Sequence, residues 1–230
     1  MKTVLQLACP LVLLLGGSGS AMAQSNIDAA RKWSWAENAG WINWFDNGAA
    51  SGARVNDTYL SGFIWSEAFG WVFLGNGTPA GGLHYSNLTA ADTGVNVASN
   101  GDLFGFAWAE NFGWINFNTA VAGPNRGRVE FCCPVARFRG YVWGENVGWI
   151  SLETAFGVNL AAGAGASHGD LDGNGVRNGN DIQRFISVLL DPSLATAREL
   201  CSADMNGDGV IDTLDLSAMV SCLLTGSCPC

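Results

Sequence analysis

The sequence predicts an all-β repeat domain followed by a small all-α domain. A tryptophan-containing motif recurs four times in the first two thirds of the chain, and a twelve-residue acidic loop recurs twice near its C-terminus. An apolar helical pattern follows each loop. Repeats at such spacings are typical of units that pack on one another, because a single unit cannot bury its apolar face alone.

The N-terminus has the pattern of a secretory signal peptide, which we place at residues 1–23. Lys2 supplies a positive charge, residues 4–15 form a short apolar run, and residues 21–23 form a small-residue cleavage site. The apolar run is too short to span a bilayer. We therefore expect a secreted protein, extracellular or at the cell surface, with no membrane span.

Composition limits the classes of partner that the chain can bind and indicates the redox state of its cysteines. The formal net charge is −9 and only 13% of the residues are charged, which argues against nucleic acid or an anionic membrane surface as a partner. An even number of cysteines in an exported chain favours disulfides. We expect at least one disulfide among the last four, while a bridge between the adjacent Cys132 and Cys133 stays open; the six cysteines after the signal peptide are Cys132, Cys133, Cys201, Cys222, Cys228 and Cys230.

The tryptophan motif predicts a β-hairpin in each of its four copies. It reads W-x-E-x-x-G-W-[IV]-x-apolar, and the copies begin at Trp35, Trp65, Trp108 and Trp143. Alternating aromatic and β-branched residues favour strands, and the central glycine suits a turn. Further strands are expected upstream of the later copies, which would make those units three-stranded meanders, at residues 53–56, 94–97 and 127–130.

Closure of the array is a further expectation. Residues 156–160 resemble residues 93–97, so we expect this segment to join the first unit and close the sheet. An open β-sandwich is the competing arrangement. The small-residue stretch that follows has little to pack and predicts a linker. The expected organisation is a Trp-rich β-repeat domain at 24–160, a Gly/Ala linker at 161–168 and a domain that contains the two acidic loops at 169–230.

The two acidic loops lie 34 residues apart and share one spacing. Oxygen-bearing side chains occupy loop positions one, three, five, nine and twelve, and glycine occupies position six. This spacing wraps a short backbone around one hard cation, with a backbone carbonyl from position seven. The sequence therefore predicts two Ca²⁺ sites.

The helices after the loops carry matching apolar positions. Ile182, Phe185, Ile186 and Leu189 correspond to Leu216, Met219, Val220 and Leu223. This is the spacing of one face of an amphipathic helix. We expect these two faces to be buried against each other.

Two loop–helix units with aspartate at the twelfth position, joined by a short helix, resemble the type I dockerin module, a pair of EF-hand-type calcium loops. The tryptophan repeats are similar to short Trp-Gly repeats of bacterial secreted proteins. The dockerin resemblance implies two bound Ca²⁺ ions, docking to a cohesin-like domain on a scaffold or surface protein, and a setting in extracellular polysaccharide degradation. It assigns the metal ligands as Asp170, Asp172, Asn174, Val176 (carbonyl), Asn178 and Asp181 in the first loop, and Asp204, Asn206, Asp208, Val210 (carbonyl), Asp212 and Asp215 in the second.

The resemblance also implies partner contacts and an inequality between the loops. Partner contacts fall at residues 179–180 and 213–214, with Ser187 and Ser221 further along the helices. Arg177 replaces an apolar residue that normally packs between the loops, and the first loop has fewer carboxylates. We expect the first loop to bind Ca²⁺ more weakly.

Three roles compete for the tryptophan repeats. The favoured role is structural, with the aromatics forming the core of the β array. In the second role, exposed tryptophans stack on the sugar rings of a polysaccharide. The third is glycoside hydrolysis, which needs two carboxylates in different environments. The repeated glutamates qualify only by residue type, because equivalent units give them equivalent environments; they are Glu37, Glu67, Glu110 and Glu145.

The leading prediction is a non-catalytic, calcium-binding component of an extracellular polysaccharide-degrading or surface assembly, with no catalytic residue assigned. One alternative is a hydrolase acting on O-glycosyl bonds through an unrecognised β domain. The other is a calcium-stabilised structural protein of the cell surface.

Overall fold

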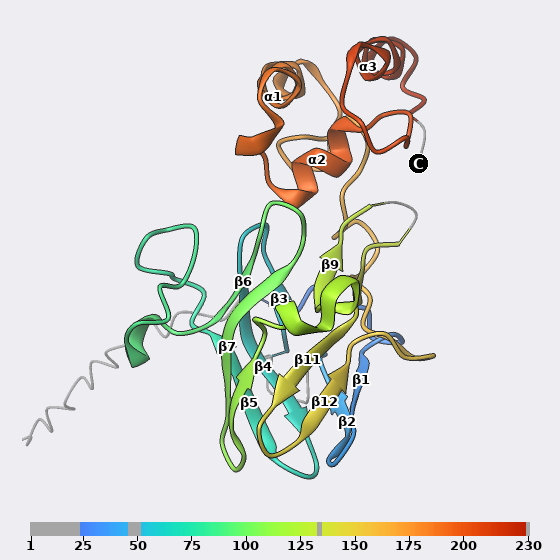
Figure 1. Ribbon diagram of the computed structural model, residues 1–230. Helices are drawn as coiled ribbons and strands as arrows, with labels where there is room; N and C mark the ends of the chain where they lie inside the picture. Colours follow the sequence, from blue (N-terminus) through green and yellow to red (C-terminus); the bar gives the residue numbers. More distant parts are fainter. Residues whose placement is uncertain (1–23, 46–51, 133–134, 229–230) are drawn as a thin grey trace, which may run out of the picture.

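The computed structural model describes residues 24–45, 52–132 and 135–228. A β region forms one end of the molecule and three helices form the other (Figure 1). The predicted signal peptide, Cys133 and Cys230 lie outside the described residues. Within the described residues no helix is both long and apolar enough to cross a membrane.

Each copy of the tryptophan motif forms an antiparallel hairpin, as predicted. The four hairpins follow one another in a single sheet, and β12 pairs with β1 while β2 pairs with β4, so the sheet closes on itself. Closure leaves these eight strands without a free edge. The hairpins are β1 (Trp33–Ala36) with β2 (Gly40–Asn43), β4 (Leu60–Ser66) with β5 (Gly70–Gly75), β7 (Leu103–Ala109) with β8 (Gly113–Asn116), and β11 (Tyr141–Gly144) with β12 (Gly148–Ser151).

The hairpin turns need the glycine of the motif. Gly40 opens β2 with a φ of 75°, and the equivalent glycine of the fourth hairpin, Gly148, has a φ of 74°. Residues with a Cβ rarely adopt this left-handed backbone conformation. The glycine therefore lets the chain reverse within three residues and brings the two tryptophans of each motif opposite each other.

Small and aliphatic side chains line the inner face of the strands, and most tryptophans are not buried. Ala36, Ala107 and Val72 are fully buried, whereas Trp35 and Trp114 are 40% and 48% exposed. All ten tryptophans fall in described residues, and Trp44 is the one that is buried, donating its indole N–H to the Ser34 hydroxyl at 2.8 Å. The prediction that the tryptophans form the core is therefore wrong for the other nine; the aromatic side chains that join Trp44 in the core are Phe69, Phe117, Phe131 and Phe138.

The upstream strands differ in part from expectation. β3 (Arg54–Val55) pairs with β4 and β6 (Val95–Val97) pairs with β7, which completes two meanders as predicted. β9 (Arg128–Glu130) instead pairs with β10 (Arg137–Arg139), a strand that the sequence reading missed, in a separate two-stranded sheet. The fourth unit is therefore a hairpin only.

Residues 156–160 lie beside the first unit but do not close the sheet. Leu160 forms an isolated bridge with Ile27, and the Asn159 carbonyl accepts the Asp28 N–H at 2.9 Å. Closure is thus confirmed, but the strand that provides it was wrongly assigned. The β1–β12 pair closes the sheet because four consecutive hairpins suffice to complete the ring.

The helical region contains three α-helices and a short 3₁₀ turn. They are α1 (Gly179–Leu190), the 3₁₀ turn Pro192–Leu194, α2 (Ala197–Ala203) and α3 (Thr213–Thr225). Each helix begins with a reciprocal capping pair, in which the cap side chain and the third helical residue bond each other's backbone N–H. These pairs start α1 and α3 at the same point of each loop.

The buried face of each outer helix is rotated relative to the prediction. Phe185 and Val188 of α1 are buried, while Ile182 and Ile186 are 41% and 44% exposed. The cause is Asp181, which must face the loop and is itself fully buried. Buried positions then follow at four and seven residues beyond it. The same rule holds in α3, where Asp215, Met219 and Cys222 are buried and Leu216 and Val220 are exposed.

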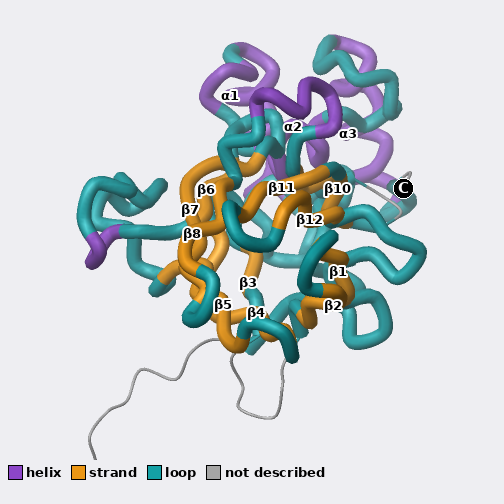
Figure 2. Tube along the Cα trace, turned by 60° about the horizontal axis from the view of Figure 1, so that its bottom comes forward, coloured by secondary structure: helices purple, strands orange, loops and turns teal. Residues whose placement is uncertain are grey.

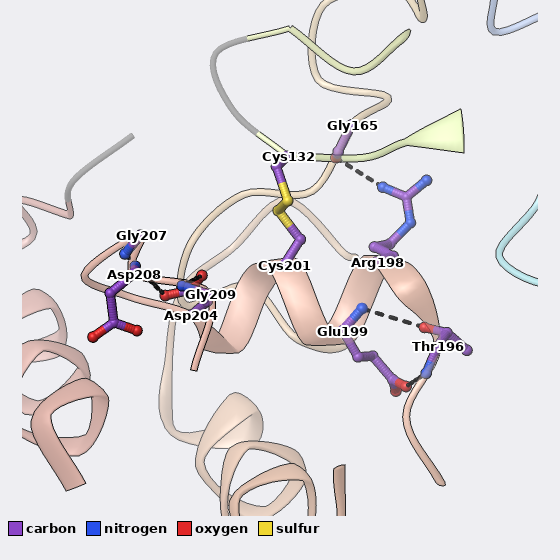
Figure 3. Close-up of a disulfide and its surroundings, with 10 residues drawn as sticks. All are labelled: Cys132, Gly165, Thr196, Arg198, Glu199, Cys201, Asp204, Gly207, Asp208 and Gly209. Carbon is purple, nitrogen blue, oxygen red and sulfur yellow. Dashed lines mark hydrogen bonds between the residues drawn. A yellow bond between two sulfur atoms is a disulfide. The ribbon is translucent and has the colours of Figure 1, made fainter. Parts of the chain in front are cut away.

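α2 fastens the helical region to the β region. Cys201 of α2 forms a disulfide with Cys132, which follows β9, and their Cα atoms are 5.4 Å apart. Arg198 donates to the Gly165 carbonyl at 2.7 Å (Figure 3). It also donates to the Ala164 carbonyl at 2.9 Å and lies over the ring of Phe131 at 4.9 Å. The predicted linker, residues 161–168, is thus hydrogen-bonded to α2 through Arg198.

The disulfides answer two questions that the sequence left open. Cys222 pairs with Cys228, as expected for the C-terminal group. Cys132 pairs with Cys201 across the two regions, and Cys133 lies outside the described residues. Only the fold could reveal the long-range pair, since its cysteines are 69 residues apart.

Candidate calcium-binding loops

The first loop folds around the carboxylate of Asp170. One oxygen accepts the backbone N–H of Asn174 at 3.1 Å, and the other accepts that of Gly175 at 3.0 Å. Asp181 closes the loop from its far end, where its Oδ1 accepts the Leu171 N–H at 2.8 Å. The first and last ligand positions therefore point into one ring of backbone.

The second loop repeats this network at the equivalent positions. Asp204 accepts the N–H groups of Asp208 at 3.1 Å and Gly209 at 2.9 Å, and Asp215 accepts that of Met205 at 2.8 Å. Figure 3 shows Asp204 directly after the last residue of α2, the helix that carries Cys201 of the disulfide to Cys132. Two loops 34 residues apart thus adopt one conformation.

Glycine at position six serves the turn that the sequence predicts. Gly175 has a φ of 81° and Gly209 a φ of 83°. A Cβ at either position would meet no other atom within 4 Å, so the requirement is backbone conformation and not space. In calcium loops of this kind, such a turn lets position five supply a side-chain oxygen and position seven a backbone carbonyl.

The first loop gathers three carboxylates at one point. Ligand oxygens of Asp170, Asp172 and Asp181 all lie within 4.8 Å of one another, and two of these residues are buried. Three anionic groups at this separation repel each other unless a cation lies between them. Hard oxygen ligands in this number suit Ca²⁺, with Asn174 and the Val176 carbonyl available to complete the shell.

The buried position-twelve aspartates carry two tasks. Asp181 and Asp215 are fully buried, and each accepts the backbone N–H of its helix cap at 2.9 Å, from Asn178 and Asp212 respectively. Each therefore ties its loop to the start of the following helix. An ion that binds these carboxylates would order the loop and the helix together.

Arg177 and Ile211 occupy equivalent positions but behave differently. Ile211 packs against the apolar core of the helical region, whereas Arg177 is exposed and donates to the His168 carbonyl at 2.8 Å. The first loop thus lacks one apolar contact. Weaker Ca²⁺ binding by the first loop stays a prediction.

An ion pair between α1 and α2 holds the first loop unit in place. Arg184 bonds both oxygens of Glu199, one of them from Nη2 at 2.8 Å. Burial by itself raises the pKa of Glu199, but the bonds from Arg184 and from the Thr196 backbone outweigh it and leave that pKa below its usual value. Sequence reading missed this pair, because the partners are 15 residues apart on different helices.

The repeated glutamates of the tryptophan motif are exposed turn residues. Glu37 Oε2 accepts the Trp149 backbone N–H at 3.2 Å, which joins the first hairpin to the fourth. Glu110 joins the third hairpin to the second through its own N–H, which donates to the Trp71 carbonyl at 3.0 Å. These residues connect neighbouring hairpins and occupy equivalent places in the ring.

Comparison with known families agrees with the loop geometry. Residues 168–224 match the family model of the dockerin type I domain, so the helical region is a type I dockerin module. Domains of this family bind calcium and cohesin domains, and the proteins that carry them are typically extracellular. No curated protein and no solved structure matches the chain.

Proposed function

We propose that the chain is a secreted protein whose C-terminal module binds two Ca²⁺ ions and docks to a cohesin-like domain on a scaffold or surface protein. Its β region would then be a non-catalytic component of an extracellular polysaccharide-degrading or surface assembly. The twelve loop residues assigned from the sequence would supply the ligands, six to each ion.

The observation that carries this proposal is the duplication of one loop network. The same backbone N–H groups, at equivalent positions, bond Asp170 and Asp204 at the start of the loops and Asp181 and Asp215 at their ends. The position-five side chains repeat as well: Asn174 Oδ1 accepts the Val176 N–H at 2.7 Å, and Asp208 Oδ1 accepts the Val210 N–H at 2.8 Å.

An apolar surface on the outer helices supports docking. Ile182 and Ile186 on α1, and Leu216 and Val220 on α3, are each 39–48% exposed. They lie one position beyond the buried face of their helices, and the contact residues implied by the family, 179–180 and 213–214, are also exposed. Apolar side chains gathered on helix faces are typical of surfaces that bind a partner protein.

The non-catalytic assignment rests on the repeated glutamates. All four are exposed at the tips of equivalent turns, and at least one is engaged by backbone N–H. Glycoside hydrolysis needs one carboxyl group that stays protonated beside one that is ionised. Equivalent environments give no such difference, so the hydrolase alternative has less support.

Docking is tested by capture of the full-length chain on an immobilised panel of cohesin domains. We expect retention in calcium and release when a calcium chelator is added. Asp215→Ala should lose retention, while Glu145→Gln, at an exposed turn of the β region, should keep it. Retention that survives chelation, or no retention on any cohesin, would overturn the docking proposal.

A further inference from the structure

Among the described residues, two of the grooves on the outer surface of the closed sheet lie between neighbouring hairpins. The first has a volume of about 970 Å³ and lies between the first and second hairpins, lined by Trp33, Trp35, Trp41, Trp65, Glu67 and Phe156. The second has a volume of about 440 Å³ and lies between the second and third hairpins, lined by Phe63, Trp71, Phe73, Trp108 and Glu110. Neither groove involves the calcium loops.

The two grooves share one design. One side of each groove is a tryptophan of one hairpin, namely Trp41 in the first groove and Trp71 in the second. The other side is the tryptophan and glutamate of the W-x-E sequence in the next hairpin. Trp65 borders the first groove and Trp71 the second, and these two residues are register partners with ring centroids 4.9 Å apart. The grooves therefore flank a single tryptophan pair and form one continuous surface, which we call the aromatic band: Trp35, Trp41, Trp65, Trp71 and Trp108.

The band is exposed at both ends and half-buried at its central pair, Trp65 and Trp71. Trp41 and Trp108 are each 43% exposed, although neither belongs to the buried core. Exposed apolar area costs free energy, and contiguous patches of it mark binding surfaces. The tryptophans of each hairpin pair edge to face, which fixes the orientation of the exposed indoles.

Spacing and charge define the ligand. Successive tryptophan pairs are two strands apart, or about 10 Å at a strand spacing of about 4.8 Å, which is comparable to the length of two sugar rings in an extended chain. Pyranose rings carry a face of C–H groups that stacks on indole, and their hydroxyls can donate to Glu67 and Glu110. The two carboxylates repel an anionic polymer.

We infer that the aromatic band binds a neutral polysaccharide chain, with sugar rings stacked across the two grooves and hydroxyls donating to Glu67 and Glu110. Repeated platforms on one rigid sheet let several weak stacking contacts act together. The inference concerns the β region alone. It predicts that polysaccharide binding continues when calcium is removed, so its failure is distinguishable from failure of docking.

The test is retention of the full-length chain on insoluble neutral polysaccharides, namely amorphous cellulose, xylan and mannan, with polygalacturonate as the anionic comparison. We expect retention on at least one neutral polymer, none on polygalacturonate, and no change on chelation of calcium. Trp41→Ala and Trp108→Ala, one from each groove, should each weaken binding about tenfold, the equivalent of about 1.4 kcal/mol.

Trp143→Ala is the matched control, because Trp143 holds the equivalent place in the fourth hairpin, is 39% exposed and lines neither groove. It should bind as the unmodified chain does, and near-ultraviolet circular dichroism should show that every variant is folded. Glu67→Gln keeps a hydrogen-bond acceptor and should retain at least part of the binding.

Three results would overturn the inference. The first is no retention on any neutral polymer. The second is equal weakening by Trp143→Ala, which would mean that the grooves are not the site. The third is a complete loss of binding with Glu67→Gln together with retention of polylysine by the unmodified chain, which would identify the band as a site for cations.

Discussion

At the scale of single residues, the position-twelve aspartates make the hydrogen bonds that connect each loop to its following helix. Asp181 and Asp215 are buried charges that bond the backbone at both ends of their loops. A buried carboxylate is stable only when its hydrogen bonds or a cation compensate for lost solvation. The network therefore links calcium binding to the folding of each loop.

Asp181→Ala should remove one Ca²⁺ site and destabilise the helical region. The loss leaves the N–H groups of Leu171 and Asn178 without acceptors, at a cost of about 1–3 kcal/mol for each buried group. Calorimetric titration and urea unfolding in calcium would measure both effects. Gln183→Ala is the control, and a variant that still binds two ions would contradict the assignment of Asp181.

Glu199 should make the stability of the helical region depend on pH. Its pKa is lowered in the folded state, with burial opposing and the bonds from Arg184 and Thr196 prevailing. The resulting stability is present above the unfolded pKa of about 4.5 and is lost as the pH falls below that value. Urea unfolding between about pH 5 and pH 3, in saturating calcium, should show a smaller decline for Glu199→Gln than for the unmodified chain; Glu67→Gln should leave the decline unchanged.

At the scale of elements, the hairpin turn is the unit on which the closed sheet is built. Gly40 has a φ of 75°, and a Cβ there would lie 3.8 Å from the ring of Trp35, which is ordinary contact. A substitution therefore tests the backbone conformation and not steric fit. The turn must hold its shape for Trp35 and Trp41 to remain paired.

Gly40→Ala should lower the free energy of unfolding by about 1–2 kcal/mol, the cost of a left-handed conformation for a residue with a Cβ. Gly179→Ala is the control, since Gly179 begins α1, has no left-handed φ and has open space around its Cα. Thermal unfolding would compare the two. An equal effect of both substitutions would contradict the role given to the turn.

The hairpins and the loops could be predicted from sequence because their determinants are local. A tryptophan, a turn glycine and a second tryptophan fall within seven residues, as in Trp35, Gly40 and Trp41. The direction in which Trp35 points could not be predicted the same way. Alternation gives two faces, and only the closed sheet shows that the face of Ala36 is buried and that of Trp35 is exposed.

The buried face of α1 also could not be predicted from apolar spacing alone. Apolar spacing alone suggested that Ile182, Phe185 and Ile186 face the core together. Asp181 overrides that spacing, because its bond to the Leu171 N–H in the loop fixes which side of α1 faces inward. Treating the last ligand as a buried residue would have given the correct face and left Ile182 and Ile186 at the surface.

At the scale of the whole molecule, the two regions are joined as one body. Figures 1 and 2 show the helices gathered at one end of the closed sheet. Cys132–Cys201 and Arg198 connect α2 to the β region, and the Arg198 side chain also pairs with Asp57. A docked partner would therefore hold the aromatic band in a fixed orientation.

Replacing both cysteines of the Cys132–Cys201 pair with serine should cost about 4 kcal/mol, because the disulfide closes a loop of 69 residues. Replacing Cys222 and Cys228 should cost about 2 kcal/mol, since their loop spans 6 residues. Urea unfolding of the two double variants tests the ranking. A larger loss from the short-loop pair would contradict the view that the long-range disulfide fastens the regions together.

Calcium stoichiometry tests the central claim most directly. Calorimetric titration of Ca²⁺ into the metal-free full-length chain should show two bound ions, with the weaker site lost in Asp181→Ala and the tighter one in Asp215→Ala. One ion or none would contradict the account.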